Sequence, residues 1–235
     1  MSLNYLHNTN IFYMKEGIYS NKIKQDFIHT TPSLDEKELV MVLEKKGKKI
    51  VNQIMQAWET SYMKELAKIA TSKGGNVLEV GFGMGISAGF IEKSKKIKTH
   101  TVVECHPLMI QSAKKKFAKQ IQSKKFILKE GFWEDVTKKV PNESFDGILF
   151  DSCPLDQEVE FFQFFPFFKE AFRLLKKDGI FTYFSDEPLK LSKRHVVELT
   201  KAGFKNIDFK VCKVHPPKDC LYWKHNTIVA PIIRK

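Results

Sequence analysis

From about residue 76 to the C-terminus, short apolar runs alternate with longer amphipathic stretches, which predicts alternating strands and helices. We expect strands at 77–81, 99–104, 126–128, 145–151, 179–185, 207–214 and 226–233, and helices from 86, at 107–120, at 157–175 and at 192–202. The last two strands have no long helix between them, so they predict an antiparallel hairpin. The chain is therefore predicted to be an α/β protein with a mostly parallel, seven-stranded, doubly wound Rossmann-like sheet.

The region before residue 76 has a different pattern. Residues 33–36 (Ser-Leu-Asp-Glu) resemble a capping box, which predicts a helix over 34–45 that Gly47 interrupts. Residues 49–70 are predicted to be helical, bent near 60–61, with Glu59 beside an apolar stripe. We expect residues 1–48 to form an N-terminal extension and candidate lid, and residues 49–235 to form the main domain.

Composition excludes some classes of protein. The chain has 235 residues and no run of 18 apolar residues, so no membrane span or membrane partner is expected. The N-terminus also lacks the pattern of a secretion signal. The four cysteines (Cys105, Cys153, Cys212 and Cys220) form no C-x-x-C pair, which favours reduced thiols and a cytoplasmic location.

The net charge of +12 raises the question of a nucleic-acid partner. Only Arg173, Arg194 and Arg234 are arginines among the 39 basic residues, and the lysines are spread along the chain. Base edges and phosphates are usually read by arginine. A solvated basic surface is the preferred interpretation, and a nucleic-acid footprint is the alternative.

A glycine-rich turn follows the first predicted strand of the sheet. Gly81, Gly83 and Gly85 have the spacing G-x-G-x-G, which lets a ligand approach the backbone closely. The next strand ends at Glu104, where an acid can accept hydrogen bonds from the two hydroxyls of a ribose. These two features predict a nucleoside cofactor at the ends of the two strands.

Three further residues belong to the same edge of the predicted sheet. Trp133 would either flank a flat base or pack in the core, and Glu134 would either accept from an exocyclic amine or begin a helix. Asp151 ends an apolar strand, where a carboxylate needs a partner or a task, although it could also cap a turn. Together with Glu59, it would suit a planar cation with paired donors, such as guanidinium.

Residues 161–172 contain a dense phenylalanine cluster (Phe161, Phe162, Phe164, Phe165, Phe167, Phe168 and Phe172). Core packing is one interpretation, and the interface of a homodimer is the other. No Ser-His-Asp order, phosphate-binding P-loop or metal-ligand cluster is recognisable, so no metal is expected.

Several motifs resemble the guanidinoacetate N-methyltransferase family. They comprise residues 58–63, 79–85, 104–105, 131–136, 145–151, 171–176 and 216–222, so the resemblance runs from about residue 49 to the C-terminus. It implies a class I methyltransferase fold, S-adenosylmethionine as methyl donor and a guanidino nitrogen as acceptor. Residues 104–107 also resemble arginine δ-nitrogen methyltransferases, which modify an arginine in a protein.

The resemblance also implies roles for individual residues. Glu59 and Asp151 would grip the guanidinium, and Asp151 would accept its proton. Donor contacts would come from Met55, Met63, Gly81, Phe82, Gly83, Met84, Gly85, Ile86, Ser87, Glu104, Cys105, His106, Trp133, Glu134 and Asp151.

The chain departs from the family after the fifth strand, where the family binds the substrate carboxylate with an uncharged turn. Asp186 and Glu187 stand there, and we expect them to contact substrate and to disfavour guanidinoacetate itself. The sequence therefore predicts an S-adenosylmethionine-dependent N-methyltransferase acting on a small guanidino compound. Protein arginine methylation is the first alternative, and an RNA-modifying or nucleic-acid-binding protein is the second.

Overall fold

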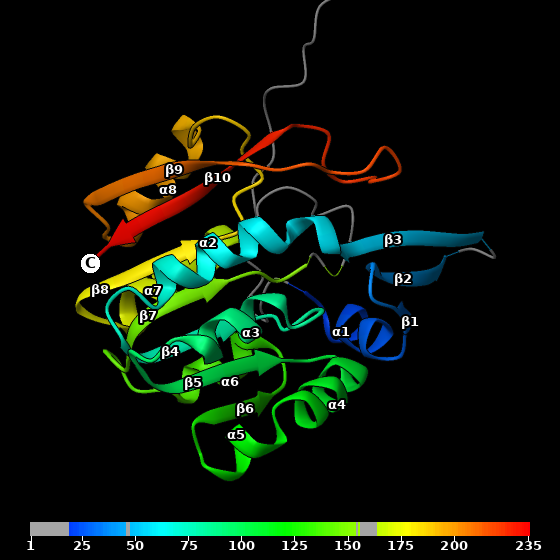
Figure 1. Cartoon of the computed structure of the whole chain (residues 1–235), viewed down its shortest axis with the longest axis horizontal. Helices are drawn as coiled ribbons and strands as arrows, with labels where there is room; N and C mark the ends of the chain where they lie inside the picture. Colours follow the sequence, from blue (N-terminus) through cyan, green and yellow to red (C-terminus); the bar gives the residue numbers. More distant parts are fainter. Residues whose placement is uncertain (1–18, 46–47, 154, 156–163) are drawn as a thin grey trace, which may run out of the picture.

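The computed structural model describes residues 19–45, 48–153, 155 and 164–235. Its centre is a sheet of seven strands in the order β6-β5-β4-β7-β8-β10-β9, in which β10 runs antiparallel to both of its neighbours (Figure 1). The strands are β4 (Gly75–Val80), β5 (Ile97–Glu104), β6 (Phe126–Glu130), β7 (Phe145–Phe150), β8 (Leu175–Tyr183), β9 (Asn206–Lys213) and β10 (Thr227–Arg234). The predicted fold class is confirmed, including the terminal hairpin.

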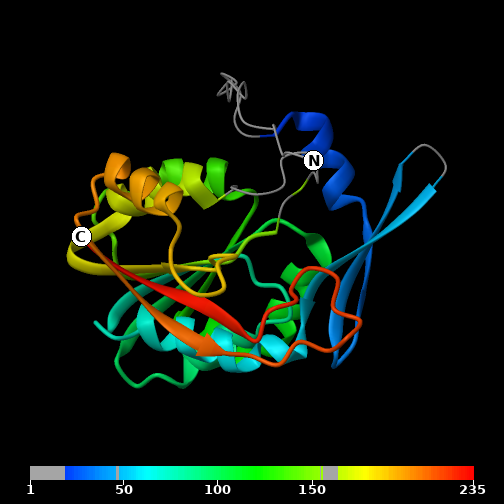
Figure 2. The ribbon, with the colours of Figure 1, turned by 90° about the horizontal axis from the view of Figure 1, so that it is seen from above.

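Helices cover both faces of this sheet, with α2 on one side and α7 and α8 on the other (Figure 2). The helices are α1 (Asn21–Ile28), α2 (Thr60–Ala70), α3 (Ile86–Lys93), α4 (Pro107–Lys116), α5 (Ala118–Gln122), α6 (Trp133–Val136), α7 (Phe164–Leu174) and α8 (Lys193–Ala202), with 3-10 turns at Ala57–Glu59 and Thr137–Lys139. No helix in the described part of the chain is long and apolar enough to cross a membrane.

Two hydrophobic cores lie on the two faces of the sheet. One contains Tyr62, Met63 and Leu66 of α2, all fully buried. The other contains Phe167 and Phe168 of α7, also fully buried, so the core interpretation holds for this part of the phenylalanine cluster. Residues 156–163, which include the expected start of this helix, lie outside the described residues.

The helix predicted at 34–45 in the N-terminal region is wrong. A small antiparallel sheet stands there instead, made of β1 (Thr31–Leu34), β2 (Glu38–Lys45) and β3 (Lys48–Gln56). The capping-box pattern is a turn, because the carboxylate of Asp35 accepts hydrogen bonds from the backbone N–H groups of Lys37 (2.7 Å) and Glu38 (2.8 Å). In β2, Leu39 and Met41 are buried while Val42 is exposed, which is the two-residue period of a strand.

The helix predicted from residue 49 is also wrong up to Gln56, because these residues form β3, which pairs with β2. Helical structure begins at Ala57, where the backbone N–H of Gln56 donates to the carboxylate of Glu59 (2.9 Å). The boundary predicted at 48/49 thus falls at the start of β3, and the division into extension and main domain stays a prediction.

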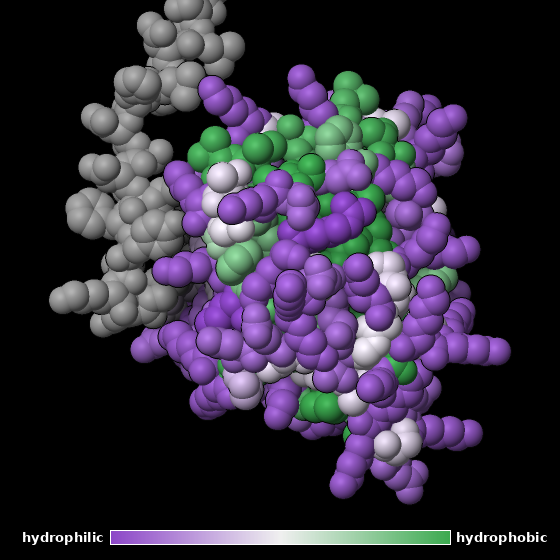
Figure 3. All heavy atoms as spheres, turned by 90° about the vertical axis from the view of Figure 1, so that its left-hand side faces the viewer, coloured by the Kyte–Doolittle hydropathy of each residue, from purple (hydrophilic) through white to green (hydrophobic). Residues whose placement is uncertain are grey.

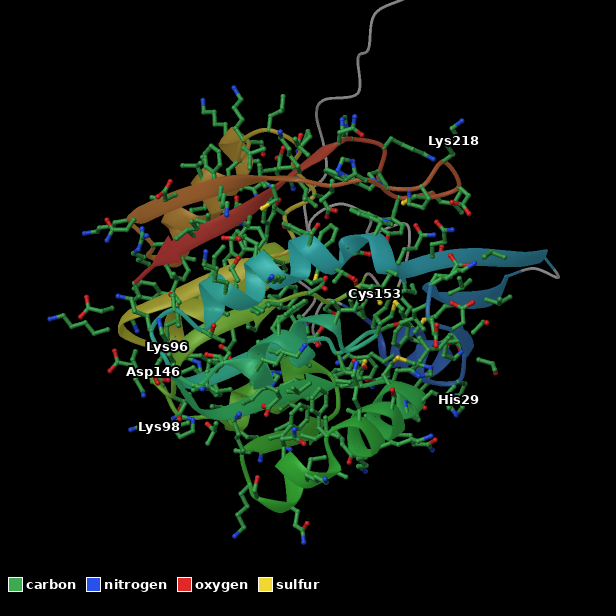
Figure 4. All side chains as sticks on the ribbon, in the orientation of Figure 1. His29, Lys96, Lys98, Asp146, Cys153 and Lys218 are labelled. Atoms are coloured by element: carbon green, nitrogen blue, oxygen red, sulfur yellow. The ribbon has the colours of Figure 1, made fainter. Side chains whose placement is uncertain are left out.

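Two smaller differences concern later elements. The helix expected over 107–120 divides into α4 and α5 at Phe117, and the short helix α6, for which no separate element was predicted, follows β6. Figure 4 shows Cys153, just after β7, on the side of the molecule that also carries His29 and Lys218. Asp146, near the start of β7, lies with Lys96 and Lys98 at the opposite side (Figure 4).

The side that carries the amino ends of the parallel strands is mostly hydrophilic, with a smaller apolar area (Figure 3). The carboxyl ends of the parallel strands point toward α1 and the small sheet β1–β3 (Figure 1). Ligands of doubly wound sheets bind at the carboxyl ends of the strands, so we expect the site at this end of the sheet.

Candidate active site

The turn after β4 has no room for side chains. Gly81 has φ +89°, and a Cβ atom there would lie 1.9 Å from the carbonyl oxygen of Asp151. A Cβ atom on Gly83 would lie 3.0 Å from Sδ of Met55. Glycine is therefore required by the packing of β4 against β7 as well as by access to the backbone.

Glu104 is fixed at the end of β5 by three backbone donors. Its Oε2 accepts from the N–H of Phe82 (2.8 Å), and its Oε1 accepts from the N–H groups of Cys105 (2.8 Å) and His106 (2.8 Å). The first bond ties the acid to the glycine turn. The carboxylate is thereby held in one orientation, with acceptor capacity left on Oε2.

Trp133 fits both of its interpretations. Its ring packs edge-on against Phe150 (6.0 Å between centroids) and Phe167 (5.1 Å), yet the residue also lines the pocket described below. Glu134 is 8% exposed, and its Oε2 has no hydrogen-bond partner among the described residues. Burial raises the pKa of this carboxyl. Because Oε2 is buried without a described partner, it is an acceptor available to a donor group of a ligand.

One pocket brings many of the predicted residues together. It is lined by Gly81, Gly83, Glu104, Cys105, His106, Trp133, Glu134 and Asp151. The N-terminal region, expected as a candidate lid, adds a wall of apolar residues that were not among the predicted site residues: Tyr19, Phe27, Leu39 and Met41. The alternation of Leu39, Met41 and their neighbours in β2 was the pattern that could have revealed it.

Three contacts attach this wall to the main sheet. Lys24 forms an ion pair with Asp135 (3.1 Å), and Nε2 of His106 lies 3.3 Å from Oγ1 of Thr30. The hydroxyl of Tyr19 accepts from the backbone N–H of Leu155 (3.3 Å). The N-terminal region is thus part of the pocket.

Glu59 lies apart from this lining, at the junction between β3 and α2. It is 2% exposed, and its Oε1 accepts from the N–H of Gln56 and from the hydroxyl of Tyr222. The Tyr222 ring stacks on Trp58 (5.9 Å between centroids). Burial, followed by the nearby charge of Asp151, raises the pKa of Glu59 to about 8.

Asp151 follows β7 and is partly exposed in the pocket. The pKa of Asp151 is raised to about 7, first because the surrounding protein removes water from it and then because of the charges of Glu79 and Asp186. Glu79 is buried in β4 and lies 2.9 Å from His100. The charges of Asp151 and Asp186 thus oppose ionisation of Glu59, and the charge of Asp186 opposes ionisation of Asp151.

Asp186 and Glu187 have different surroundings. Asp186 is exposed, but the protein around it and then Glu187 raise its pKa to about 7. The Glu187 carboxylate accepts from the N–H of Ser192 (3.2 Å) and lies 3.4 Å from Nε2 of His195. Glu187 is thus directed toward α8, whereas Asp186 belongs to the carboxyl cluster.

The remaining predicted donor contacts are absent from the pocket lining. They are Met55, Met63, Phe82, Met84, Gly85, Ile86 and Ser87. Met63 and Phe82 are buried in the core, and Ser87 donates to Glu79. Their predicted role as donor contacts stays a prediction.

Solved structures share this fold. The crystal structure of spermidine synthase from Thermotoga maritima aligns with a TM-score of 0.61 at 15% identity, covering 87% of this chain and 72% of that one. M. jannaschii TYW2 in complex with AdoMet aligns with a TM-score of 0.54 at 16% identity, covering 86% of this chain and 87% of that one.

Sequence comparison finds nearer relatives. Protein arginine N-methyltransferase 2 of Aspergillus fumigatus is 31% identical over 137 residues, which is 57% of this chain and 31% of that protein. The Saccharomyces cerevisiae protein of the same name is 28% identical over 141 residues, which is 56% of this chain and 32% of that protein. The chain thus matches about a third of the length of these relatives.

The profile of one protein family, described as guanidinoacetate N-methyltransferase, matches residues 35–235. It confirms the resemblance and the methyltransferase class predicted from the motifs, and the match begins within the turn before β2. The chain belongs to the guanidinoacetate N-methyltransferase family, whose members use S-adenosylmethionine as methyl donor.

Proposed function

We propose that this chain methylates a guanidino nitrogen of a small molecule, with S-adenosylmethionine as the donor. The observation that carries the proposal is the cluster of Glu59, Asp151 and Asp186 beside the pocket. Within the described part of the chain, no lysine or arginine forms an ion pair with any of the three. A cluster of mutually opposed carboxyl groups favours a cationic ligand.

The pocket fits the donor. Gly81 and Gly83 leave the backbone open, and Glu104 is oriented for ribose hydroxyls. The unpartnered Oε2 of Glu134 suits the exocyclic amine of adenine, and Trp133 offers a ring beside it. When bound, the donor supplies a methyl group made electrophilic by the positive sulfur.

The chain's own residues then have two tasks. Glu59 orients the guanidinium through Oε2, because Oε1 is already occupied by Gln56 and Tyr222. Asp151 accepts, on a carboxylate oxygen, the proton that leaves the methylated nitrogen. Its pKa of about 7 is close to that of a base operating at neutral pH.

A transfer assay with labelled S-adenosylmethionine tests this proposal. The acceptors are guanidinoacetate, free arginine, 4-aminobutylguanidine and an arginine-containing peptide. We expect label in at least one guanidino compound, with the methyl group on nitrogen by mass spectrometry. Donor binding without transfer to any of the four would reject the proposal.

Methylation of an arginine side chain in a protein is the second candidate. It is favoured by the relatives named protein arginine N-methyltransferase 2, which match a little over half of this chain. The peptide in the assay separates it from the first candidate. Both use the same two carboxylates for the same guanidinium group.

A further inference from the structure

Asp186 is held in place by the turn that follows β8. The hydroxyl of Ser185 donates to the carbonyl of Val229 (2.7 Å), and the N–H of Glu187 donates back to that hydroxyl (3.3 Å). Asp186 itself has φ +55°, in the left-handed region. Aspartate and asparagine tolerate this region better than most residues, so the turn fixes where the Asp186 side chain begins.

The turn places Asp186 beside Asp151. Strands β7 and β8 are parallel neighbours in which Phe150 pairs with Tyr183, and the N–H of Phe184 donates to the carbonyl of Phe150 (3.1 Å). The two aspartates therefore follow the ends of adjacent strands. The charge of Asp186 also opposes ionisation of Asp151 and, more weakly, of Glu59.

The Asp186 carboxylate differs from its neighbour in its contacts within the described part of the chain. Its neighbour Glu187 is tied to Ser192 and His195, but no hydrogen bond or ion pair from the described residues reaches the Asp186 or Asp151 carboxylates. Asp186 is exposed, whereas Glu59 is 2% exposed. Glu59 thus marks the closed end of the carboxyl cluster and Asp186 its open end.

We propose that Asp186 binds a second positive charge on the acceptor, so that the preferred substrate is a slender alkylguanidine with an amine, and no carboxylate, at its far end. This inference rests on the proposed function. Glu59 and Asp151 receive the guanidinium, and Asp186 receives the ammonium group near solvent. A carboxylate in the same place would face the acid of Asp186, which forms no ion pair with a lysine or arginine of the described residues.

The enclosure of Glu59 favours a small molecule over a peptide. The stacked rings of Trp58 and Tyr222 lie beside it, and Tyr222 donates to its carboxylate. A peptide arginine carries only a neutral backbone to the position of Asp186, so it would leave this carboxyl without a cation.

Three acceptors of equal spacer length test the proposal: 4-aminobutylguanidine, butylguanidine and 5-guanidinopentanoate. We expect kcat/KM to fall roughly tenfold from the amine to the neutral compound, as for loss of one charge-assisted hydrogen bond, and about tenfold again to the acid. A peptide with one arginine and no other charged residue is measured beside them and should react no better than butylguanidine.

Asp186→Asn should reduce the preference for the amine over the neutral compound to about twofold, because asparagine keeps the left-handed turn and loses the charge. Asp186→Lys should reverse the order and favour the acid. Glu198→Gln, which removes a half-buried charge paired with the exposed Lys201 on α8, is the matched control and should leave the order unchanged. Thermal melting and donor binding show that each variant is folded.

The role of Asp186 and the proposed function are rejected by different outcomes. Transfer to no guanidino compound, guanidinoacetate and the peptide included, rejects both. Transfer in the wild type without a preference for the amine, or with the preference intact in Asp186→Asn, rejects the role of Asp186 alone. A peptide arginine that reacts tenfold better than the amine rejects the small-molecule acceptor.

Discussion

The two halves of the site differ in how their carboxylates are satisfied. On the side where we propose that the donor binds, Glu104 accepts three backbone hydrogen bonds at 2.8 Å each. On the acceptor side, Asp151 and Asp186 have pKa values raised to about 7, and Glu59 to about 8. The donor half is organised before any ligand binds, whereas the acceptor half is crowded with acids that a cation would stabilise.

This difference shows how the site can separate two tasks. A ribose is neutral, so its binding needs an oriented acceptor whose charge is already compensated by N–H groups. A guanidinium is charged, so it is attracted by carboxylates whose negative charge no group of the protein compensates. The acceptor half therefore gives up stability in the free protein to gain affinity for a cation.

The largest expected effect is on the acceptor side. Asp151→Asn should lower kcat about 10²- to 10⁴-fold, since the amide cannot take the proton from the guanidinium. Donor affinity should change much less, because Glu104 and the glycine turn are intact. Single-turnover transfer and donor titration measure the two quantities, and an equal loss in both would show that the two halves are not separable.

The matching change on the donor side is Glu104→Gln. It keeps the shape but replaces the charged acceptor of three N–H groups, so donor affinity should fall about 10- to 100-fold. Calorimetry of donor binding measures the loss. Glu130→Gln, at the exposed end of the adjacent strand β6, is the control and should bind the donor normally.

A smaller effect is expected where Glu59 is supported. Tyr222→Phe removes the hydroxyl that donates to Glu59 but keeps the ring on Trp58. We expect KM for the guanidino acceptor to rise about two- to tenfold, with donor affinity unchanged. Steady-state kinetics with both substrates varied decides between this result and a general loss of folding, which would lower both affinities.

The smallest effect concerns stability and pH. The pKa of Asp151 is about 7 in the folded chain against an ordinary value of 3.8, so the folded state keeps a proton that the unfolded state releases. Its contribution to stability therefore falls as pH rises from about 4 to 7 and stays low above that. Asp151→Asn should raise the melting temperature by a few degrees at pH 8 and hardly at all near pH 4. A gain that is equal at both pH values would contradict the unfavourable charge.

The sequence sufficed for the parts of the molecule with a clear hydrophobic period. The sheet, its glycine turn and the acids at its strand ends follow from local patterns, because buried parallel strands are short apolar runs with defined ends. The helices predicted within residues 34–56 were wrong because the same sequence pattern is compatible with a helix and with a pair of strands. Asp35 and Glu36 match a helix cap, but tertiary pairing of β1 with β2 makes the same residues a hairpin turn.

Other features of the site depend on long-range contacts that no local pattern carries. The hydrogen bond from Tyr222 to Glu59 joins residues 163 positions apart. The different contacts of Asp186 and Glu187 depend on α8, since Ser192 and His195 contact Glu187. Their sequence is two adjacent acids, and only the fold distinguishes them.

The N-terminal wall of the pocket has a kinetic consequence. Tyr19, Phe27 and Met41 close one side of the pocket, so a spent cofactor cannot leave that way while they stay docked. Among the described contacts, an ion pair between Lys24 and Asp135 helps to hold them there. Ionic strength, which screens this pair, should therefore alter how long the product remains bound, and with it the turnover rate, without touching any group that performs the chemistry.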